Sequence, residues 1–227
     1  MTSVGGCAAL REDIEARGLA WRGAFHPAAA DAVPPLPGGR AARTLVLIGF
    51  AGGQQWPGFA SSLEASDGQP HPLNRWSRRL VEDIARGHDG LGLYPADGPP
   101  WLPFQRWAQR AEPIHPSPLG ILIHAEFGLW HSYRGAIALP VPLALPKLAD
   151  CASPCASCVA RPCMSSCPVG AFRPGTYDTA ACIAHVASPA GRDCLELGCR
   201  ARRSCPVGRE HHYSAEQAGF HMRAFIR

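Results

Sequence analysis

CASCVARPCMSSCPVGAF, from Cys155 to Phe172, contains four cysteines, and a proline follows the last of them. A second run, CLELGCRARRSCPVG, begins at Cys194 and also ends in Cys-Pro-Val-Gly. The chain has 227 residues and ten cysteines, and nine of the ten lie beyond residue 150. Cysteines crowded in this way predict a small, ligand-stabilised module in the last third of the chain.

The spacing of the two runs indicates the kind of ligand. The first is C-x2-C-x4-C-x3-C-P, and the second is C-x4-C-x5-C-P. Ferredoxins with two clusters carry C-x2-C-x2-C-x3-C-P, and its fourth cysteine ligates the other cluster. The first run here keeps the C-x3-C-P ending of that pattern, although the gap between its second and third cysteines is wider. The spacing therefore favours two 4Fe–4S clusters.

Two other interpretations compete with the clusters. Two zinc sites with four cysteines each fit the number of thiolates, but they give no reason for a Cys-Pro ending on both runs. A disulfide framework is disfavoured in a reducing compartment. On the cluster hypothesis, Cys155, Cys158 and Cys163 take Cys205 as their fourth ligand. Crossing in the other direction joins Cys167 to Cys194 and Cys199, and Cys182 is the remaining candidate.

Composition limits the partners and the compartment. The net charge is only +4, and lysine occurs once, so no strong field for nucleic acid is expected. No apolar run is long enough to span a bilayer, and the first eighteen residues lack the pattern of a signal peptide. We therefore expect no membrane partner and a cytoplasmic location.

Ahead of the cysteines, the hydrophobic pattern predicts alternating helices and strands. We expect a C-terminal helix after the cysteines as well, opened by a capping box at Ser214. The expected helices cover residues 9–18, 71–87, 104–112 and 214–227, and the expected strands cover 18–25, 43–52, 91–95, 119–127 and 133–141.

Prolines at 140, 142 and 146 interrupt this periodicity. The sequence therefore predicts an α+β domain with one sheet over residues 1–145 and a small iron–sulfur domain over 146–227. We expect the last two strands of the front domain to be joined by a short turn around Gly128.

The cysteine-rich part resembles the ferredoxin-like domain of epoxyqueuosine reductases and reductive dehalogenases. In the epoxyqueuosine reductases, a helix cysteine in an RCI-like stretch is a cluster ligand, and ACIAHV at residues 181–186 is similar to that stretch. The resemblance implies that Cys182 completes the second set. Cys7 and Cys151 are then left over, and Cys151 either replaces the first ligand or is a spare thiol.

The segment LGILIHAEFGLWHSYRGAIALP, residues 119–140, resembles cobalamin-processing cblC-type proteins and, more distantly, epoxyqueuosine reductase. This resemblance implies a nitroreductase-like front domain that binds cobalamin with its lower ligand detached. The corrinoid contacts would then be His124, Phe127, Gly128, Trp130, Tyr133 and Arg134. The alternative for the aromatic residues is a place in the core, for Gly128 a turn, for His124 a structural hydrogen bond and for Arg134 a surface ion pair.

The sequence also departs from epoxyqueuosine reductase. Those enzymes use an aspartate general acid, and Asp97 in PADGPP is the one acid in a similar loop, with a poor match. They also carry a helical extension for transfer RNA, whereas this chain ends soon after Cys205. Both departures argue against nucleic acid as a partner.

The resulting hypothesis is an oxidoreductase that is a corrinoid reductase or a corrinoid-processing protein. Its partners would be the corrinoid, a small substrate or upper ligand, and an electron donor such as a flavoprotein or a ferredoxin reductase. One alternative is an electron-transfer module without a corrinoid, and a second is an RNA enzyme similar to epoxyqueuosine reductase. The catalytic residues are not assigned.

Overall fold

One of the two inner strands of the main sheet is β2, Thr44–Ala51, and its first seven residues are all buried. The computed structural model describes residues 4–227. Its main sheet has four strands in the order β1-β2-β6-β3, so β2 is hydrogen-bonded on both sides. A strand that is covered on both faces reads as a continuous apolar run, which is why TLVLIGF shows no alternation. The prediction of a buried strand here is confirmed.

The other three strands of this sheet are β1 (Ala20–Phe25), β3 (Leu91–Leu93) and β6 (His131–Leu139). β1 is antiparallel to β2, and β3 is antiparallel to β6. The pairing of β1 with β2 shifts register between Trp21 and Ala24. Gly23 lies in this bulge with a φ of +83°, and a Cβ atom there would overlap the carbonyl oxygen of Ala111. Glycine therefore lets β1 approach the end of the helix that precedes Glu112.

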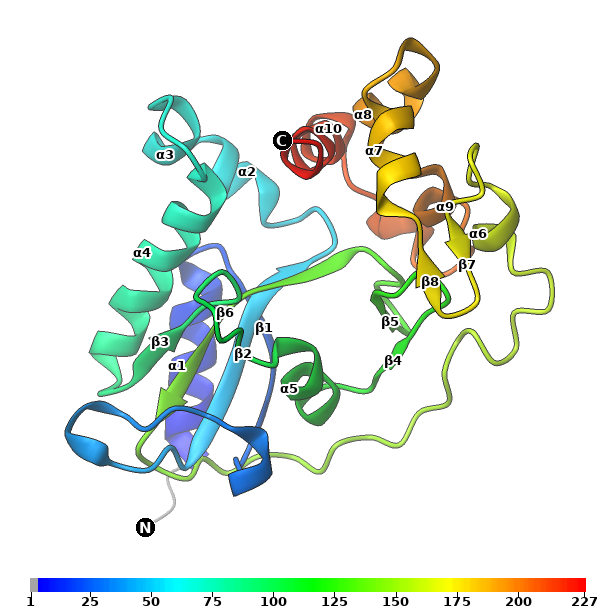
Figure 1. Cartoon of the computed structure of the whole chain (residues 1–227). Helices are drawn as coiled ribbons and strands as arrows, with labels where there is room; N and C mark the ends of the chain where they lie inside the picture. The colour runs from blue at the N-terminus through cyan, green and yellow to red at the C-terminus, as the bar shows by residue number, and fades with distance from the viewer. Residues whose placement is uncertain (1–3) are drawn as a thin grey trace. The chain divides into compact units, whose positions relative to one another are not determined.

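Helices cover both faces of this sheet (Figure 1). On α4, Pro72–Gly87, an apolar stripe faces inward and includes Trp76, Val81 and Ile84. On α5, Phe104–Ala111, Trp107 is fully buried and its indole N–H donates to the carbonyl oxygen of Asp31 at 2.8 Å. These are the two helices that the 3.6-residue period predicts most clearly.

The remaining helices of this part are short except for the first, which begins earlier than residue 9. They are α1 (Val4–Ala16), α2 (Trp56–Ala60) and α3 (Leu63–Ser66), with 3-10 turns at Ala29–Asp31 and Pro37–Gly39.

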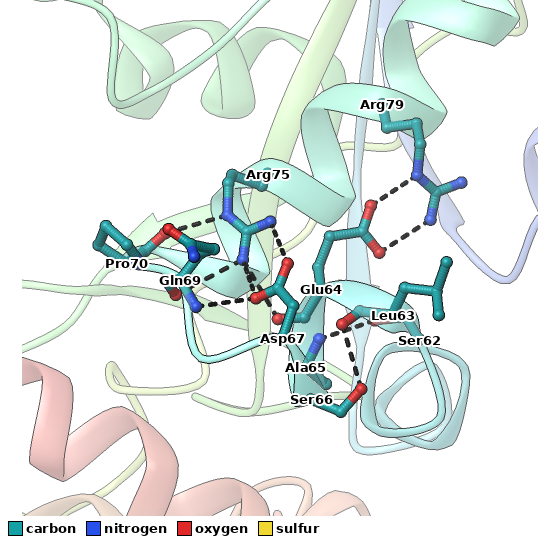
Figure 2. Close-up of polar contacts among 10 residues, drawn as sticks. All are labelled: Ser62, Leu63, Glu64, Ala65, Ser66, Asp67, Gln69, Pro70, Arg75 and Arg79. Carbon is teal, nitrogen blue, oxygen red and sulfur yellow. Dashed lines mark hydrogen bonds and ion pairs between the residues drawn. The ribbon is translucent and has the colours of Figure 1, made fainter.

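Two ion pairs fix the loop between α3 and α4 (Figure 2). Arg79 donates to both carboxylate oxygens of Glu64, at 2.6 and 3.0 Å, and Arg75 donates to both oxygens of Asp67, at 2.7 Å each. Arg75 also donates to the carbonyl oxygen of Pro70 at 3.0 Å. Because the guanidinium groups belong to α4, they hold the loop against the first turns of that helix.

The contacts divide the chain into two units. The first unit runs to Pro113 and resumes over Ser132–Asp150, and the second contains Ile114–His131 and Cys151–Arg227. The change of unit after Asp150 lies five residues beyond the boundary predicted at 145. The segment 114–131 was expected in the front domain, but it packs with the cysteine-rich part because its apolar residues form a core there.

The second unit consists of short elements. Its strands are β4 (Ile114–Pro116), β5 (Leu122–His124), β7 (Phe172–Arg173) and β8 (Thr176–Tyr177); its helices are α6 (Pro162–Ser165), α7 (Thr179–Val186), α8 (Arg192–Leu197), α9 (Arg200–Arg203) and α10 (Ala215–Phe225), with 3-10 turns at Pro189–Gly191 and Arg209–His211. Ser214 caps α10 by accepting a hydrogen bond from the Gln217 N–H at 3.2 Å. This is the first half of the predicted capping box, and the reciprocal bond from the Gln217 side chain is not formed.

One strand expectation is wrong. The stretch 119–127 forms only the three-residue strand β5, which pairs with β4 and not with β6. The His124 N–H donates to the carbonyl oxygen of Gly128 at 2.8 Å, so the chain turns back on itself directly after β5. The apolar period of 119–127 reflects packing against the cysteine segments and not membership of the main sheet.

No helix within residues 4–227 combines the length and the apolar character that crossing a membrane requires.

Candidate metal centre

The second cysteine set lines one pocket. Its walls carry Cys167, Cys182, Cys194 and Cys199. The four residues come from four different places: the end of the first run, α7, α8 and the turn before α9. Phe172, Val186, Ala201 and Met222 contribute apolar walls. Four thiols that line one apolar pocket fit an iron–sulfur cluster, because such a cluster needs four thiolate ligands and shielding from water.

A hydrogen-bond donor reaches the first of these sulfur atoms, because the Ala171 N–H donates to Cys167 Sγ at 3.4 Å. Burial raises the pKa of the Cys194 and Cys199 thiols, and nearby backbone N–H groups offset part of that rise. Donors of this kind stabilise the negative charge of a bound thiolate.

The first set is also brought together. Burial raises the pKa of the Cys155 thiol, and the nearby sulfur atoms of Cys205, Cys163 and Cys158 raise it further. Burial likewise raises the pKa of Cys163, with contributions from Cys205 and Cys158. Cys205 is buried in a small core, and Cys155 and Cys163 pack against it. Cys155 and Cys163 thus pack against the core that contains Cys205, and the assignment of the first set to one cluster stays a prediction.

All ten cysteines are free thiols. Within residues 4–227, no group of three or more histidine, cysteine, aspartate or glutamate side chains is spaced to hold a single metal ion. Cys7 lies in α1, which belongs to the first unit, whereas the cysteines of both sets belong to the second unit. Cys151 is half-buried and lies at the start of the segment that leads into the first run.

The segment 119–131 packs against the cysteine loops within the second unit. Leu119, Ile123 and Leu129 form one core with Ala201 and Cys205. Gly128 has a φ of +55°, and a Cβ atom there would overlap the carbonyl oxygen of Val207, two residues after Cys205. The requirement for glycine therefore comes from both the turn and the close approach of the Cys-Pro-Val-Gly ending.

Trp130 is part of the same packing. It is 2% exposed, and the guanidinium of Arg202 lies over its ring at 4.5 Å. His212 and Tyr213 contact the ring at centroid distances of 4.3 and 5.2 Å. Arg202 also donates to the carbonyl oxygen of Leu129 at 3.0 and 2.5 Å. These contacts favour the core interpretation of Trp130 over a place in a cofactor pocket.

His124 and Phe127 have structural partners as well. The backbone N–H groups of Glu126 and Phe127 donate to His124 Nδ1 at 3.0 and 3.2 Å, so the ring caps its own turn. Phe127 stacks on His124 at 4.8 Å and meets the ring of His211 at the same distance. This geometry favours the alternative in which His124 is a structural, hydrogen-bonded histidine.

Tyr133 and Arg134 belong to the first unit. The Tyr133 hydroxyl donates to Glu112 Oε2 at 3.0 Å, and Arg134 donates to Ser77 Oγ at 3.1 Å and to Asn74 Oδ1 at 2.5 Å. Neighbouring residues of a strand point to opposite faces, so Tyr133 bonds to Glu112 at the end of α5 and Arg134 bonds to α4. The six expected corrinoid contacts therefore lie in two units, and the described side chains have partners within their own unit; the corrinoid assignment stays a prediction.

Sequence reasoning missed a buried charge cluster in the first unit. Arg22 is 1% exposed and donates from Nη2 to Glu112 Oε2 at 2.8 Å. Burial raises the pKa of Glu112, and the nearby Arg22 and Tyr133 only partly offset it. Alternation along β1 was the available signal, because Arg22 follows the buried Ala20 by two residues. Asp97, in contrast, lies at the surface and pairs with Arg78.

No protein-family model matches the chain, and neither does any curated protein. Among solved structures, the chain is similar to epoxyqueuosine reductase with a tRNA-Tyr epoxyqueuosine-modified stem loop, at 17% identity and a TM-score of 0.55, covering 94% of this chain and 68% of that one. It is also similar to epoxyqueuosine reductase from Bacillus subtilis with its catalytic loop swung out of the active site, at 17% identity and a TM-score of 0.51, covering 95% and 71%.

These matches establish the fold. The chain is a mixed α/β protein with the fold of the epoxyqueuosine reductase structures. The predicted resemblance to those enzymes is thereby confirmed at the level of the fold, over 94–95% of the chain. The ferredoxin-like architecture of the second unit stays a prediction, as does the resemblance to cobalamin-processing proteins and reductive dehalogenases.

Proposed function

We propose that this chain is an iron–sulfur reductase of the epoxyqueuosine reductase type. The observation that carries the proposal is the pocket whose walls hold all four cysteines of the second set. Four thiols from separate parts of the chain line it, and one of them, Cys167, accepts a hydrogen bond from the Ala171 N–H. Crossed pairing of the two Cys-Pro runs explains this convergence, whereas two independent zinc sites do not require it.

In this proposal, Cys155, Cys158, Cys163 and Cys205 hold one 4Fe–4S cluster, and Cys167, Cys182, Cys194 and Cys199 hold the other. When bound, such clusters supply one-electron transfer. Burial raises the pKa of several of the free thiols, so assembly must release protons from them, and it should become more favourable as pH rises. The apolar walls exclude water, and the N–H donors orient the sulfur atoms.

A modified nucleoside in RNA is the substrate class that we propose to test first. The support is the fold shared with an epoxyqueuosine reductase bound to a tRNA stem loop. Reduction of an epoxide to an alkene takes two electrons and two protons and releases water. Two one-electron clusters could together supply both electrons, and a protein electron donor would be needed to reduce them again. A reducing cytoplasm is the compartment in which these thiolates are stable.

The test uses the full chain, reconstituted anaerobically with iron and sulfide. Reduced protein is incubated with an epoxyqueuosine-containing tRNA stem loop, with and without hydroxocobalamin, and the nucleosides are analysed by mass spectrometry. We expect loss of one oxygen atom from the nucleoside with the wild type and with Cys7→Ala. Cys182→Ala should abolish the reaction. Protein with full iron content and no turnover under either condition would reject the RNA substrate and favour the electron-transfer module.

Corrinoid binding stays a prediction with a separate test. Resemblance of residues 119–140 to cobalamin-processing proteins is its only support, since the six assigned residues have other partners. Hydroxocobalamin added to anaerobic protein should move the visible bands to shorter wavelength if the lower ligand detaches. An unchanged spectrum at high micromolar protein would remove the corrinoid from the account and leave the iron–sulfur part untouched.

A further inference from the structure

A second pocket of the second unit has polar walls. The residues that line it include three serines and two arginines, which are Ser165, Ser166, Ser204, Arg200 and Arg203. Cys167, Pro168 and Arg200 line both this polar pocket and the pocket of the second cysteine set. The polar pocket therefore lies directly beside that set, and the proposed cluster chemistry gives no reason for its serines and arginines.

The two arginines carry more charge than their shared partner neutralises. Arg203 Nη2 donates to Asp193 Oδ2, and Arg200 Nε lies 3.3 Å from the same oxygen. Arg203 Nε also donates to the carbonyl oxygen of Gly198 at 3.1 Å. These bonds anchor both side chains to α8 and its C-terminal cap, while both still line the pocket. One carboxylate shared by two guanidinium groups leaves one positive charge in excess.

Hydroxyl groups lie around the same pocket. The Ser166 hydroxyl donates to the carbonyl oxygen of Pro162 at 2.7 Å, and the Ser204 hydroxyl donates to that of Ala201 at 2.9 Å. A hydroxyl hydrogen rotates to suit its acceptor, so each can turn to an incoming anion. Guanidinium groups match phosphate oxygens with two parallel hydrogen bonds. Arginines and several hydroxyls in one concave site therefore suit an anion with several oxygen atoms.

The distribution of charge along the chain favours an anion in this region. Residues 151–227 contain nine arginines and five carboxylates, a difference of +4. This equals the net charge of the entire chain, so residues 1–150 are neutral on balance. A local excess of positive charge raises the concentration of anions near the surface that carries it.

We propose that the polar pocket binds a phosphate group, held by Arg200 and Arg203 together with the serine hydroxyls. The inference goes beyond the proposed function, because phosphate recognition requires neither electron transfer nor an RNA substrate. A phosphodiester of RNA and a phosphomonoester of a small ligand share this chemistry, and the experiment separates the two. Either one would be held next to the second cysteine set.

The experiment measures the binding of inorganic phosphate to the full chain, reconstituted anaerobically, by isothermal titration calorimetry. Arg200→Gln should weaken the affinity about tenfold, because it removes charge-assisted hydrogen bonds to the anion. Arg192→Gln is the matched control. It removes the same charge from a highly exposed position of the same unit, outside the pocket lining, and should change the affinity less than about twofold.

Competition identifies the source of the phosphate. Displacement of inorganic phosphate by a short unmodified oligoribonucleotide would assign the site to RNA, and displacement by a nucleoside monophosphate alone would assign it to a small ligand. Phosphate that neither ester displaces would be an adventitious ion only and would overturn the proposal. Displacement by acetate as effective as that by the esters would also overturn it, because acetate offers only two oxygen atoms.

A measurement on the wild type covers the case in which Arg200→Gln loses its clusters. Phenylglyoxal modifies exposed guanidinium groups, and phosphate should protect Arg200 but not Arg192, as read by peptide mass spectrometry. Equal protection of the two arginines would overturn the inference. Equal phosphate affinity in wild type and Arg200→Gln, with equal iron and sulfide, would do the same and would leave the proposed function intact. Arg200-dependent phosphate binding by protein that holds no cluster would support the inference and reject the proposed function.

Discussion

At the scale of single residues, the side chains of the second set show how the sequence prepares a metal centre. Cys182 is presented by α7, whose N-cap Asp178 accepts a hydrogen bond from the Ala181 N–H at 2.9 Å. Cys194 lies in α8, and Cys199 precedes α9. Each helix is short, so each is ordered by what it packs against and not by its own propensity. Ligand binding should therefore order these elements together.

Removal of Cys182 tests the crossed assignment. Cys182→Ala should lower the iron content from about eight to about four atoms per chain, because one of two 4Fe–4S sites loses a ligand. Cys7→Ala and Cys151→Ala should keep both sites, since neither residue belongs to either set. Iron and acid-labile sulfide analysis measures the change. Equal iron in Cys182→Ala and Cys7→Ala would show that the assignment is wrong, and a deficit in Cys151→Ala would place Cys151 among the ligands.

The buried pair of Arg22 and Glu112 makes a strong prediction for the first unit. Glu112→Ala should lower the free energy of unfolding by about 3 kcal/mol, because removal of one partner of a buried ion pair leaves the other charge poorly compensated. Glu12→Ala, at an exposed position of α1, is the control and should change stability by less than about 0.5 kcal/mol. Urea unfolding of the metal-free protein measures both. Equal effects would contradict the importance of the buried pair.

The same carboxyl makes stability depend on pH in a defined direction. The pKa of Glu112 is raised in the folded state, so the folded protein holds this proton more tightly than the unfolded chain does. Its contribution is fully present below the ordinary pKa of about 4.5 and is lost as pH rises through the folded value. Carboxyl NMR titration should show a Glu112 pKa above 4.5, and a value below it would contradict the burial argument.

At the scale of elements, the turn between β5 and β6 depends on glycine for two separate reasons. Gly120→Ala and Gly128→Ala form a matched pair, since both glycines have positive φ, but only Gly128 faces another backbone, at Val207. Gly120→Ala should cost about 1–2 kcal/mol from the left-handed conformation alone. Gly128→Ala should cost more and should also lower iron content, because the segment after Cys205 must move. Similar thermal stability and iron content in the two variants would contradict this packing.

The loop between α3 and α4 supplies an electrostatic prediction at the same scale (Figure 2). The hydrogen bonds from Arg79 lower the pKa of Glu64 to about 2. A lowered folded pKa contributes stability that is present above about pH 4.5 and is lost as pH falls toward 2. Glu64→Gln should lower stability at pH 7 by about 1 kcal/mol, a modest figure because Arg79 is half-exposed.

Comparison across pH checks the sign for Glu64. The difference between wild type and Glu64→Gln should shrink as pH falls from 7 toward 2. Glu15→Gln, which breaks the exposed pair with Arg11, is the control and should have almost no effect at either pH. A difference that grows on acidification would contradict the assigned pKa.

At the scale of the whole molecule, the strongest sequence signals were those with a local physical cause. The buried run of β2, the apolar stripe of α4 and the cap at Ser214 are all properties of neighbouring residues, and all were predictable. The segment 119–131 was not, because its apolar residues are compatible with a sheet strand and with packing against cysteine loops. Its partners, Ala201 and Cys205, are about eighty residues away in sequence, and periodicity carries no information about them.

The same division holds for the candidate site. The Cys-Pro endings predicted crossed sets, and the second set does line one pocket. Trp130, Phe127 and His124 were assigned from a segment resemblance, and their contacts with Arg202, His211 and the turn backbone depend on long-range packing. Arg22 and Glu112 are ninety residues apart, and they meet where β1 lies close to the end of α5 at Gly23.

The central claim, that two crossed cysteine sets hold two 4Fe–4S clusters, is tested most directly by metal analysis of anaerobically prepared wild-type protein. Iron, acid-labile sulfide and zinc are quantified on one sample together with its visible spectrum. The account predicts about eight iron and eight sulfide per chain, with a broad brown absorption that bleaches on reduction. Stoichiometric zinc without sulfide would contradict it.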